Sequence, residues 1–345
     1  MDVLDLRGDW AAPPTREMRQ AMADAEVGDD NSIEDPTVIK LERMAAELLG
    51  KEAALFVPSG TMGNLIAILT LAPWGSEVIA GEQSHIVNAE QGSAAVLGGR
   101  SVRTIPNDHA GRMDPISIKR AILPDDIHYP RTGILCVENT QNQCGGVALN
   151  IETMNEQTAP ARDAGIPVHL DGSRIWNAAA ALGVSEAEIA SSCHTVQACL
   201  SKGLAAPVGS VLAGTRDVMD VARRHRKLLG GGMRQVGVIA AAGIVALEEM
   251  RDRIGEDHHR ARRLAECLAA EPGLSIDLET VQTNLVYAST GTGIDAEALG
   301  KAMEQEGVRI SAFGPTQLRF AIHYAIDDDG IERTIATTRR AIVSA

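Results

Sequence analysis

Short apolar runs alternate with segments of helical periodicity along most of this chain, and this alternation narrows the possible folds more than any other feature. The predicted helices lie at 37–50, 65–71, 89–97, 115–122, 218–228 and 236–254. The predicted strands lie at 53–57, 77–81, 101–105, 134–137, 168–170, 196–200 and 209–213. Repeated strand and helix units predict an α/β fold with a mostly parallel, doubly wound sheet.

Length and composition predict one large core and a smaller second one. The chain has 345 residues, of which 45% are hydrophobic but only 3% aromatic, so aliphatic side chains must fill the core. Helix-covered parallel sheets have cores of that kind. We expect an extended N-terminal arm at 1–15, a large cofactor-binding domain at 16–250 and a smaller α+β domain at 251–345.

Charge, termini and cysteines exclude several classes of protein. The formal net charge of −14 disfavours nucleic acids and anionic membranes as partners. No apolar run is long enough to span a bilayer, and the start MDVLDLRGDW lacks the features of a signal peptide. Five cysteines without a CxxC pair predict reduced thiols in a cytoplasmic protein, with no metal site. No GxGxxG follows a predicted strand, which argues against a dinucleotide enzyme.

Two predicted strands end in residues that suit a carbonyl cofactor. The run at 196–200 leads to Lys202 among small residues in CLSKGLAAPVGS, and the run at 168–170 leads to Asp171 and Arg174 in VHLDGSR. An amine that captures an aldehyde and an acid that holds a ring nitrogen protonated are what pyridoxal phosphate requires. The alternatives are a solvated surface lysine and a helix-capping aspartate.

Three further positions have both a functional and an ordinary structural interpretation. The turn PSGTMGN places Ser59, Gly60 and Thr61 before a helix, which predicts either an anion site or an ordinary helix cap. His85 follows the strand at 77–81 and is either a site residue or a structural histidine. Arg319 lies in the apolar run at 318–322, where it requires a bound anion or an internal salt bridge.

Many ordered segments together resemble one family. DLRGDW, EVGDD, EDPTV, LFVPSGTMGN, GEQSH, ENTQNQCGG, HLDGSR, CLSKGLAAPVGS and LLGGGMRQ are similar to segments of the threonine aldolase branch of the aspartate-aminotransferase-like, fold type I pyridoxal phosphate enzymes, a beta-eliminating lyase family. The resemblance implies a fold like that of the pyridoxal phosphate-dependent transferases. It also implies that the N-terminal arm reaches back toward the active site.

The resemblance assigns a role to each matching residue. Catalytic roles fall on Lys202, His85 and Asp171. The resemblance implies that pyridoxal phosphate is held by Ser59, Gly60, Thr61, His85, Asp171, Arg174, Lys202 and Arg234. It implies that the substrate is bound by Gly8, Arg174, Arg319, Gln141, Ser32 and Lys227. Arg319 is expected to grip the α-carboxylate of an amino acid.

The departures from the family pattern surround the substrate. Gly8 stands where the family has a serine, and Trp10 follows it. Ser32 lies in NSIEDPT, which lacks the usual tyrosine, and Ala89 replaces an aromatic residue before the glutamate of that segment. Gln141 replaces a histidine and cannot act as a base at neutral pH. We therefore expect retained cofactor chemistry and an altered substrate pocket.

These features predict a pyridoxal phosphate-dependent aldolase. It would cleave the Cα–Cβ bond of a threonine-like β-hydroxy-α-amino acid to glycine and an aldehyde. One alternative is a lyase, racemase or other enzyme that acts on a different amino acid on the same scaffold. Another is a non-catalytic binding protein that keeps the fold. By resemblance we expect a homo-oligomer, at least a dimer and more specifically a tetramer.

Overall fold

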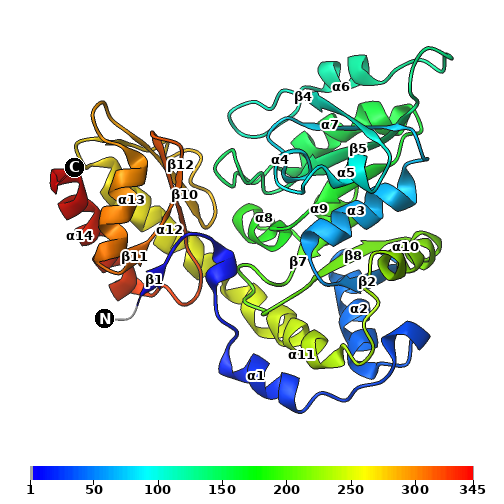
Figure 1. Cartoon of the computed structure of the whole chain (residues 1–345), viewed down its shortest axis with the longest axis horizontal. Helices are drawn as coiled ribbons and strands as arrows, with labels where there is room; N and C mark the ends of the chain where they lie inside the picture. The colour runs from blue at the N-terminus through cyan, green and yellow to red at the C-terminus, as the bar shows by residue number, and fades with distance from the viewer. Residues whose placement is uncertain (1–2, 345) are drawn as a thin grey trace.

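Two lobes make up the protein. The computed structural model describes residues 3–344, and Figure 1 shows a larger lobe on the right of the view and a smaller one on the left. The larger lobe contains a seven-stranded sheet in the order β2-β8-β7-β6-β5-β3-β4. Every pairing in it is parallel except those of β8, which is antiparallel to β7 and to β2. The predicted mostly parallel α/β fold is confirmed.

The strands of this sheet follow the apolar runs of the sequence. Their bounds are β2 (Ala53–Val57), β3 (Glu77–Gly81), β4 (Ser101–Ile105), β5 (Thr132–Glu138), β6 (Val168–Asp171), β7 (Thr195–Cys199) and β8 (Ser210–Gly214). All but β4, at the sheet edge, are buried along most of their length. Helices on both faces exclude water from the strands, which explains the lack of polar alternation.

Helices and short turns connect the strands. They are α1 (Arg16–Ala23), α2 (Pro36–Leu48), α3 (Gly60–Leu71), α4 (His85–Asn88), α5 (Ser93–Val96), α6 (Pro115–Ala121), α7 (Ile151–Asp163), α8 (Ile175–Leu182), α9 (Glu186–Ala190), α10 (Arg216–Leu228), α11 (Gly237–Val245), η1 (Asp9–Ala11) and η2 (Asp30–Ser32). Several begin at sequence-coded caps. In α2, the Asp35 side chain accepts hydrogen bonds from the N–H groups of Thr37 and Val38, and Pro36 occupies the first turn.

Two helix predictions were wrong in extent. The helix expected at 89–97 is broken, because only the four residues of α5 are helical and Gly92 precedes them in the left-handed region at φ 63°. The helix expected at 236–254 leaves regular α geometry after α11. It passes through a π-helical turn, η3 (Ala246–Met250), and a 3₁₀ turn, η4 (Arg251–Arg253). The regular helix α12 (Ile254–Ala269) then enters the smaller lobe (Figure 1).

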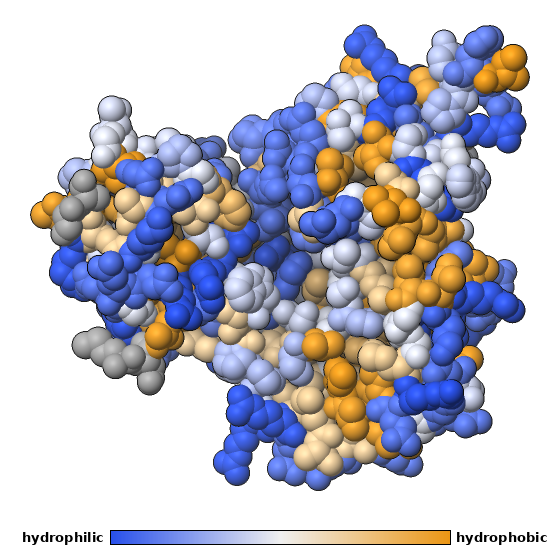
Figure 2. All heavy atoms as spheres, viewed as in Figure 1, coloured by the Kyte–Doolittle hydropathy of each residue, from blue (hydrophilic) through white to orange (hydrophobic). Residues whose placement is uncertain are grey.

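The smaller lobe is built on an antiparallel sheet of four strands in the order β12-β13-β10-β9. Its strands and helices are β9 (Leu274–Ser275), β10 (Leu285–Thr290), α13 (Ala296–Gln305), β11 (Val308–Arg309), β12 (Ser311–Phe313), β13 (Gln317–Ala321) and α14 (Asp328–Ser344). Figure 2 shows a hollowed, mostly hydrophilic face between the two lobes. This boundary is where the side chains described below meet.

The N-terminal arm is packed into the smaller lobe. Strand β1 (Leu4–Asp5) pairs in parallel with β11. Leu6 is fully buried in the apolar core of this lobe, and its backbone bonds to Arg309 and Ala321 at 2.8 and 2.9 Å. The arm then crosses to the larger lobe through η1. The division at 1–15, 16–250 and 251–345 stays a prediction, and residues 1–2 and 345 lie outside the described residues.

Neither a membrane span nor a disulfide is found in the part of the chain that is described. None of its helices has both the length and the apolar character needed to cross a bilayer. All five cysteines are free. Cys136 and Cys199 are buried in β5 and β7 as small core residues.

The buried carboxyl of Asp257 on α12 should make the stability of the fold depend on pH. Burial raises the pKa of this carboxyl to about 7, although the charge of Arg260 opposes the shift. Because the folded pKa exceeds the unfolded one, stability falls as pH rises from about 4 to above 7. We expect Asp257→Asn to remove this decline and to raise the free energy of unfolding at pH 8 by about 2–4 kcal/mol. Urea unfolding at pH 5 and pH 8 measures it, and an equal pH dependence in both proteins would contradict it.

Candidate active site

The predicted acid and amine meet at one edge of the larger sheet. Asp171 ends β6, and Lys202 follows the end of the neighbouring strand β7. The Asp171 carboxyl is 1% exposed. Burial alone would raise the pKa of Asp171, but the positive charge of Lys202, and then that of His85, brings it below its usual value. The two sequence-predicted residues therefore interact electrostatically in a buried setting.

A relay of hydrogen bonds fixes the Asp171 carboxylate. Its Oδ2 accepts from Asn64 Nδ2 at 2.8 Å and its Oδ1 from the N–H of Ser173 at 3.1 Å. Asn64 Oδ1 lies 3.0 Å from His169 Nε2, and His169 Nδ1 lies 2.9 Å from Thr195 Oγ1. Burial lowers the pKa of His169 to about 4, so the ring is neutral at pH 7 and Nε2 donates to the Asn64 carbonyl. Asp171 Oδ2 retains room for one more donor.

His85 lies beside this carboxylate and has a partner of its own. Its Nδ1 is 2.8 Å from Oε1 of Glu90, which also accepts from Asn64 Nδ2 at 2.8 Å. The hydrogen bond to Glu90 raises the pKa of His85. Burial, followed by the charge of Asp171, keeps the pKa of Glu90 above its usual value. Because Nδ1 is engaged, Nε2 is the ring nitrogen left for chemistry.

The predicted anion turn has the required backbone geometry. Ser59 caps α3 by accepting from Met62 N at 3.2 Å, and the N–H groups of Gly60 and Thr61 have no partner within the helix. A Cβ at Gly60 would lie 3.0 Å from the Sγ of Cys199. This close approach brings the turn against the end of β7, a few residues before Lys202, so the positive end of α3 faces the same edge of the sheet.

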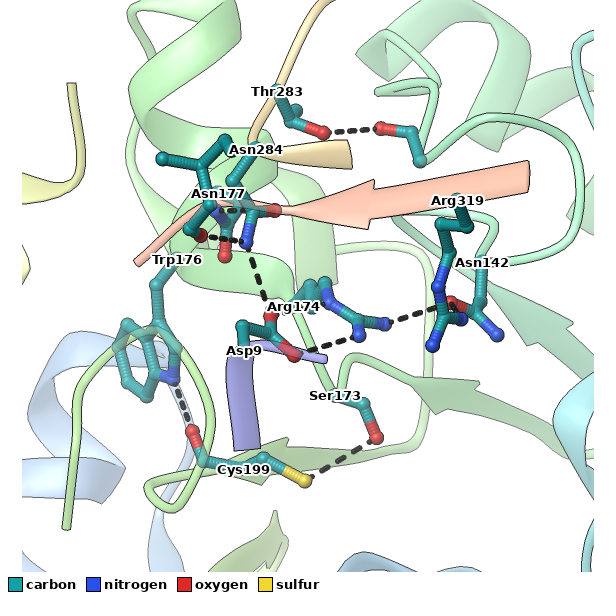
Figure 3. Close-up of polar contacts among 12 residues, drawn as sticks. Asp9, Asn142, Ser173, Arg174, Trp176, Asn177, Cys199, Thr283, Asn284 and Arg319 are labelled. Atoms are coloured by element: carbon teal, nitrogen blue, oxygen red, sulfur yellow. Dashed lines mark hydrogen bonds and ion pairs between the residues drawn. The ribbon is translucent and has the colours of Figure 1, made fainter. Parts of the chain in front are cut away.

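Both predicted carboxylate-binding arginines converge on one amide (Figure 3). Arg174 Nη1 and Arg319 Nη1 lie 3.2 and 3.4 Å from Asn142 Oδ1. The other edge of Arg174 is bound bidentately by Asp9, through Nε at 2.7 Å and Nη2 at 2.8 Å. Burial alone would raise the pKa of Asp9, but Arg174 and then Lys202 hold it well below its usual range. The N-terminal arm therefore reaches the site, as the resemblance implies.

Arg319 is buried but only partly satisfied. It is 8% exposed, its Nη2 donates to the carbonyl of Arg7 at 2.8 Å, and its guanidinium lies 5.0 Å from the centre of the Phe313 ring. Its Nε has no hydrogen-bond partner among the described residues. Tyr287 is paired with it across β10 and β13 and donates from its hydroxyl to Asn142 O at 3.0 Å. A buried guanidinium with a spare donor suits an anionic ligand.

Gln141, which we expected near the substrate, is engaged elsewhere. It is 1% exposed, its Nε2 donates to Gln83 O at 2.8 Å and its Oε1 accepts from Cys144 N at 2.8 Å. Both polar atoms of the side chain therefore hold loops together. Nothing in this geometry supports substrate binding by Gln141.

Ser32, Lys227 and Arg234 lie together but apart from Lys202. Arg234 Nη1 is 2.7 Å from Asp29 Oδ2, and Ser32 Oγ is 3.3 Å from the same carboxylate oxygen. Lys227 Nζ is 3.5 Å from Oδ1 of Asn31 in the same loop. All three predicted residues are exposed on the surface. Within one chain these residues contact Asp29 and Asn31, and they do not contact Asp171 or Lys202.

Several polar residues of the site were not predicted. The missed residues are Asp9, Asn64, Glu90, Asn142 and Asn284. Three of them, Asp9, Asn64 and Asn142, lie within segments that carried the resemblance, and Glu90 lies shortly after another such segment, GEQSH. Their closeness to predicted residues was the available signal. Asn284 has no such signal, since it precedes an ordinary strand.

Comparisons with known proteins identify the family of this chain. The family model described as "Beta-eliminating lyase" matches residues 5–290. Low-specificity L-threonine aldolase 1 of Arabidopsis thaliana is 40% identical over 100% of this chain and 98% of its own. Low specificity L-threonine aldolase of Escherichia coli (strain K12) is 44% identical over 90% of this chain and 91% of its own.

A solved structure supports the fold as well. The threonine aldolase of Leishmania major superposes with a TM-score of 0.84 at 19% identity, over 98% of this chain and 99% of that one. At this identity the likeness concerns the fold, which is that of the fold type I enzymes. The sequence matches carry the family assignment. The chain belongs to the threonine aldolase and beta-eliminating lyase family of pyridoxal phosphate-dependent lyases.

Proposed function

We propose that this protein cleaves the Cα–Cβ bond of a β-hydroxy-α-amino acid to glycine and an aldehyde, with pyridoxal phosphate as its cofactor. The observation that carries the proposal is the placement of Lys202 and the buried Asp171 at the ends of the neighbouring strands β7 and β6. The names of the relatives, which are low-specificity L-threonine aldolases, support the same reaction.

The residues at the sheet edge fit this cofactor. Lys202 would bind its aldehyde carbon, and Asp171, with one acceptor direction open, would pair with its ring nitrogen. The turn of Ser59, Gly60 and Thr61 at the start of α3 would hold its phosphate. When bound, the cofactor supplies an electron sink that stabilises the carbanion left at Cα.

The two arginines give the site its preference for amino acids. Arg319 would bind the α-carboxylate through Nη1, and Arg174 would add the donors of its outer edge, which carries its own Nη1. Fixing the carboxylate fixes the rotation about Cα, and this orientation decides which Cα bond is aligned to break.

His85 is the base that we propose for the β-hydroxyl proton. Glu90 holds its Nδ1, so the unprotonated Nε2 faces outward from the dyad. Gln141 offers no alternative, because an amide is not a base and its atoms are engaged. His85 thus replaces the base that the family pattern would supply from the position of Gln141.

Glu90→Gln tests this assignment through pH dependence. The carboxylate raises the pKa of His85, so its removal should lower that pKa. A base works only when unprotonated, and we therefore expect the acid limb of the kcat profile to shift toward lower pH, with a lower plateau. An acid limb that stays at the wild-type pH would contradict this assignment.

The substrate pocket is proposed to differ from that of a typical threonine aldolase. A Cβ at Gly8 would lie 2.0 Å from the indole Nε1 of Trp10, so the indole can occupy its position only because residue 8 is a glycine. The indole also lies 5.5 Å from the Arg7 guanidinium. Replacing a serine hydroxyl by the edge of an indole favours substrates with apolar or aromatic β-substituents.

The protein is proposed to act as a homo-oligomer, at least a dimer and more specifically a tetramer. Figure 2 shows apolar surface gathered on the lobe of the larger sheet. Exposed apolar side chains of that lobe are Trp74, Val96, Leu97, Val221, Leu228 and Val238. A neighbouring copy on this lobe is also what would bring Ser32, Lys227 and Arg234 to an active site. The cytoplasmic location stays a prediction.

A panel of β-hydroxy amino acids tests the reaction. We expect glycine and the matching aldehyde from at least one substrate, with a preference for an aromatic β-substituent over threonine. The engaged Gln141 favours one competing function, a pyridoxal phosphate enzyme that breaks another bond at Cα or Cβ. Ammonia, a keto acid or racemised substrate without glycine would identify that function. A protein that binds no cofactor would point to the non-catalytic alternative.

A further inference from the structure

Asp9 uses the whole of one edge of Arg174. The carboxylate accepts from Nε and Nη2 at 2.7 and 2.8 Å, and both side chains are buried, at 0% and 6% exposure. Both N–H groups of Nη1 and the second N–H of Nη2 remain for other partners, and Nη1 points to Asn142 (Figure 3). Arg174 is therefore held in one orientation and presents its outer edge, which carries Nη1, to the place that Arg319 also faces.

Asp9 is itself held from both lobes. Asn284, before β10 in the smaller lobe, donates from Nδ2 to Asp9 Oδ2 at 3.1 Å and to the carbonyl of Ile322 at 2.9 Å. Asn177 on α8 of the larger lobe donates to Asn284 Oδ1 at 3.2 Å. Figure 3 shows this chain of amides leading to the carboxylate and on to Arg174. A residue of the arm is thus fixed by groups from two lobes.

The three charged residues Asp9, Arg174 and Arg319 form a cluster whose net charge suits the binding of one carboxylate. Arg174 and Arg319 are both cationic, and Asp9 is anionic because Arg174 stabilises its charged form. Their sum is one positive charge facing Asn142 Oδ1, which is a neutral acceptor. Without Asp9, two guanidinium groups would compete for the same anion.

We propose that Asp9, held in place by Asn284, is a positioning residue that orients Arg174 so that the substrate carboxylate is aligned by Arg319 and by the outer edge of Arg174, which carries Nη1. This rests on the proposed function, because it assigns the two arginines to an α-carboxylate. Released from Asp9, Arg174 would turn its free edge to the carboxylate and rotate the substrate out of alignment. Asp9 therefore acts on the rate of bond cleavage and not on the strength of binding.

Asp9→Asn is the first test. We expect kcat to fall about 10- to 100-fold, since a small misplacement of the substrate has effects of that size. The affinity for glycine, measured by spectral titration of the bound cofactor without turnover, should change less than threefold. Affinity for ethylamine, which has no carboxylate, should not change. A kcat within twofold of wild type, or a tenfold weaker affinity for glycine, would overturn the proposal.

A double-mutant cycle keeps the proposal testable if Asp9→Asn folds poorly. Asn284→Ala removes the donor to Asp9 and should lower kcat at least threefold, with little change in glycine affinity. Thr283→Val is the matched control, since this neighbouring buried side chain donates to Gly146 O at 2.7 Å, outside the cluster. It should leave kcat unchanged. Equal losses in Asn284→Ala and Thr283→Val would contradict the proposal.

The double variant distinguishes an effect of Asn284 through Asp9 from independent structural damage. Because Asn284 is proposed to act through Asp9, adding Asn284→Ala to Asp9→Asn should have no further effect on kcat, whereas independent structural damage would add. Glycine titration does not depend on turnover. A wild-type protein that binds glycine but cleaves no β-hydroxy amino acid would therefore end the aldolase proposal, while the effects of Asp9→Asn on whichever Cα reaction occurs would still test this one.

Discussion

Lys202→Ala is expected to lower kcat by about 10⁴-fold or more, which corresponds to about 5.5 kcal/mol of activation free energy. We propose this amine as the nucleophile that captures the cofactor aldehyde, and an alanine methyl group could not replace it. Its charge also lowers the pKa values of Asp171 and Asp9, so the buried acids lose a counter-charge with it. Steady-state rates measure the first effect. Intact mass after borohydride reduction, which fixes the cofactor to the amine, shows the loss of attachment directly.

Lys40→Ala is the matched control for this experiment. Lys40 lies on the surface of α2 and pairs with Glu248 at 3.1 Å, with about half of each side chain exposed. We expect unchanged kcat and an unchanged mass increase after borohydride, because exposed ion pairs contribute little. Attachment of the cofactor to Lys202→Ala at the wild-type level would show that another amine binds it, and the assignment of the site would be wrong.

The buried strands were predictable because a strand that is covered by helices on both faces consists of consecutive apolar residues. The runs at 53–57 and 77–81 coincide with the buried strands β2 and β3. The breaks in the helices were not predictable from periodicity. Gly92 adopts a left-handed conformation in an otherwise helix-compatible segment, and the π-helical turn of Ala246–Met250 carries no local signal.

Residues at strand ends were predictable, but their partners were not. Asp171 and Lys202 follow apolar runs, and parallel strands bring such ends to one edge. The partner of Arg174 lies 165 residues away in the arm, and Asn284 lies 275 residues from Asp9. Hydrogen bonds of this range depend on how the arm and the smaller lobe pack, and a single asparagine or aspartate in the sequence does not encode its partner. Gln141 is a further example, since its predicted role depended on resemblance, whereas its amide bonds to Gln83, 58 residues away, and to Cys144 in its own loop.

Asp171→Asn is the second change with a large expected effect, a fall in kcat of about 10³-fold. The amide preserves the size of the side chain, but it lacks the charge that would keep the cofactor ring nitrogen protonated, and without that proton the ring is a weak electron sink. The change also places an amide where Asn64 and Ser173 both donate, so one of these donors loses its acceptor. The pH dependence of the cofactor spectrum provides a measurement that is independent of turnover, and we expect it to change with kcat.

Glu138→Gln separates the role of Asp171 from the removal of any buried carboxyl at this edge. Glu138 ends β5 in register with Asp171, and burial raises its pKa to about 7. It accepts from the backbone N–H groups of His85 and Asn142 at 2.8 Å, so both carboxylate oxygens are engaged in holding these two segments. We therefore expect a loss in kcat below tenfold and a cofactor spectrum with the wild-type pH dependence. If Glu138→Gln were as damaging as Asp171→Asn, the charge of Asp171 would have no special place in the chemistry, and the effect of both changes would be one of folding.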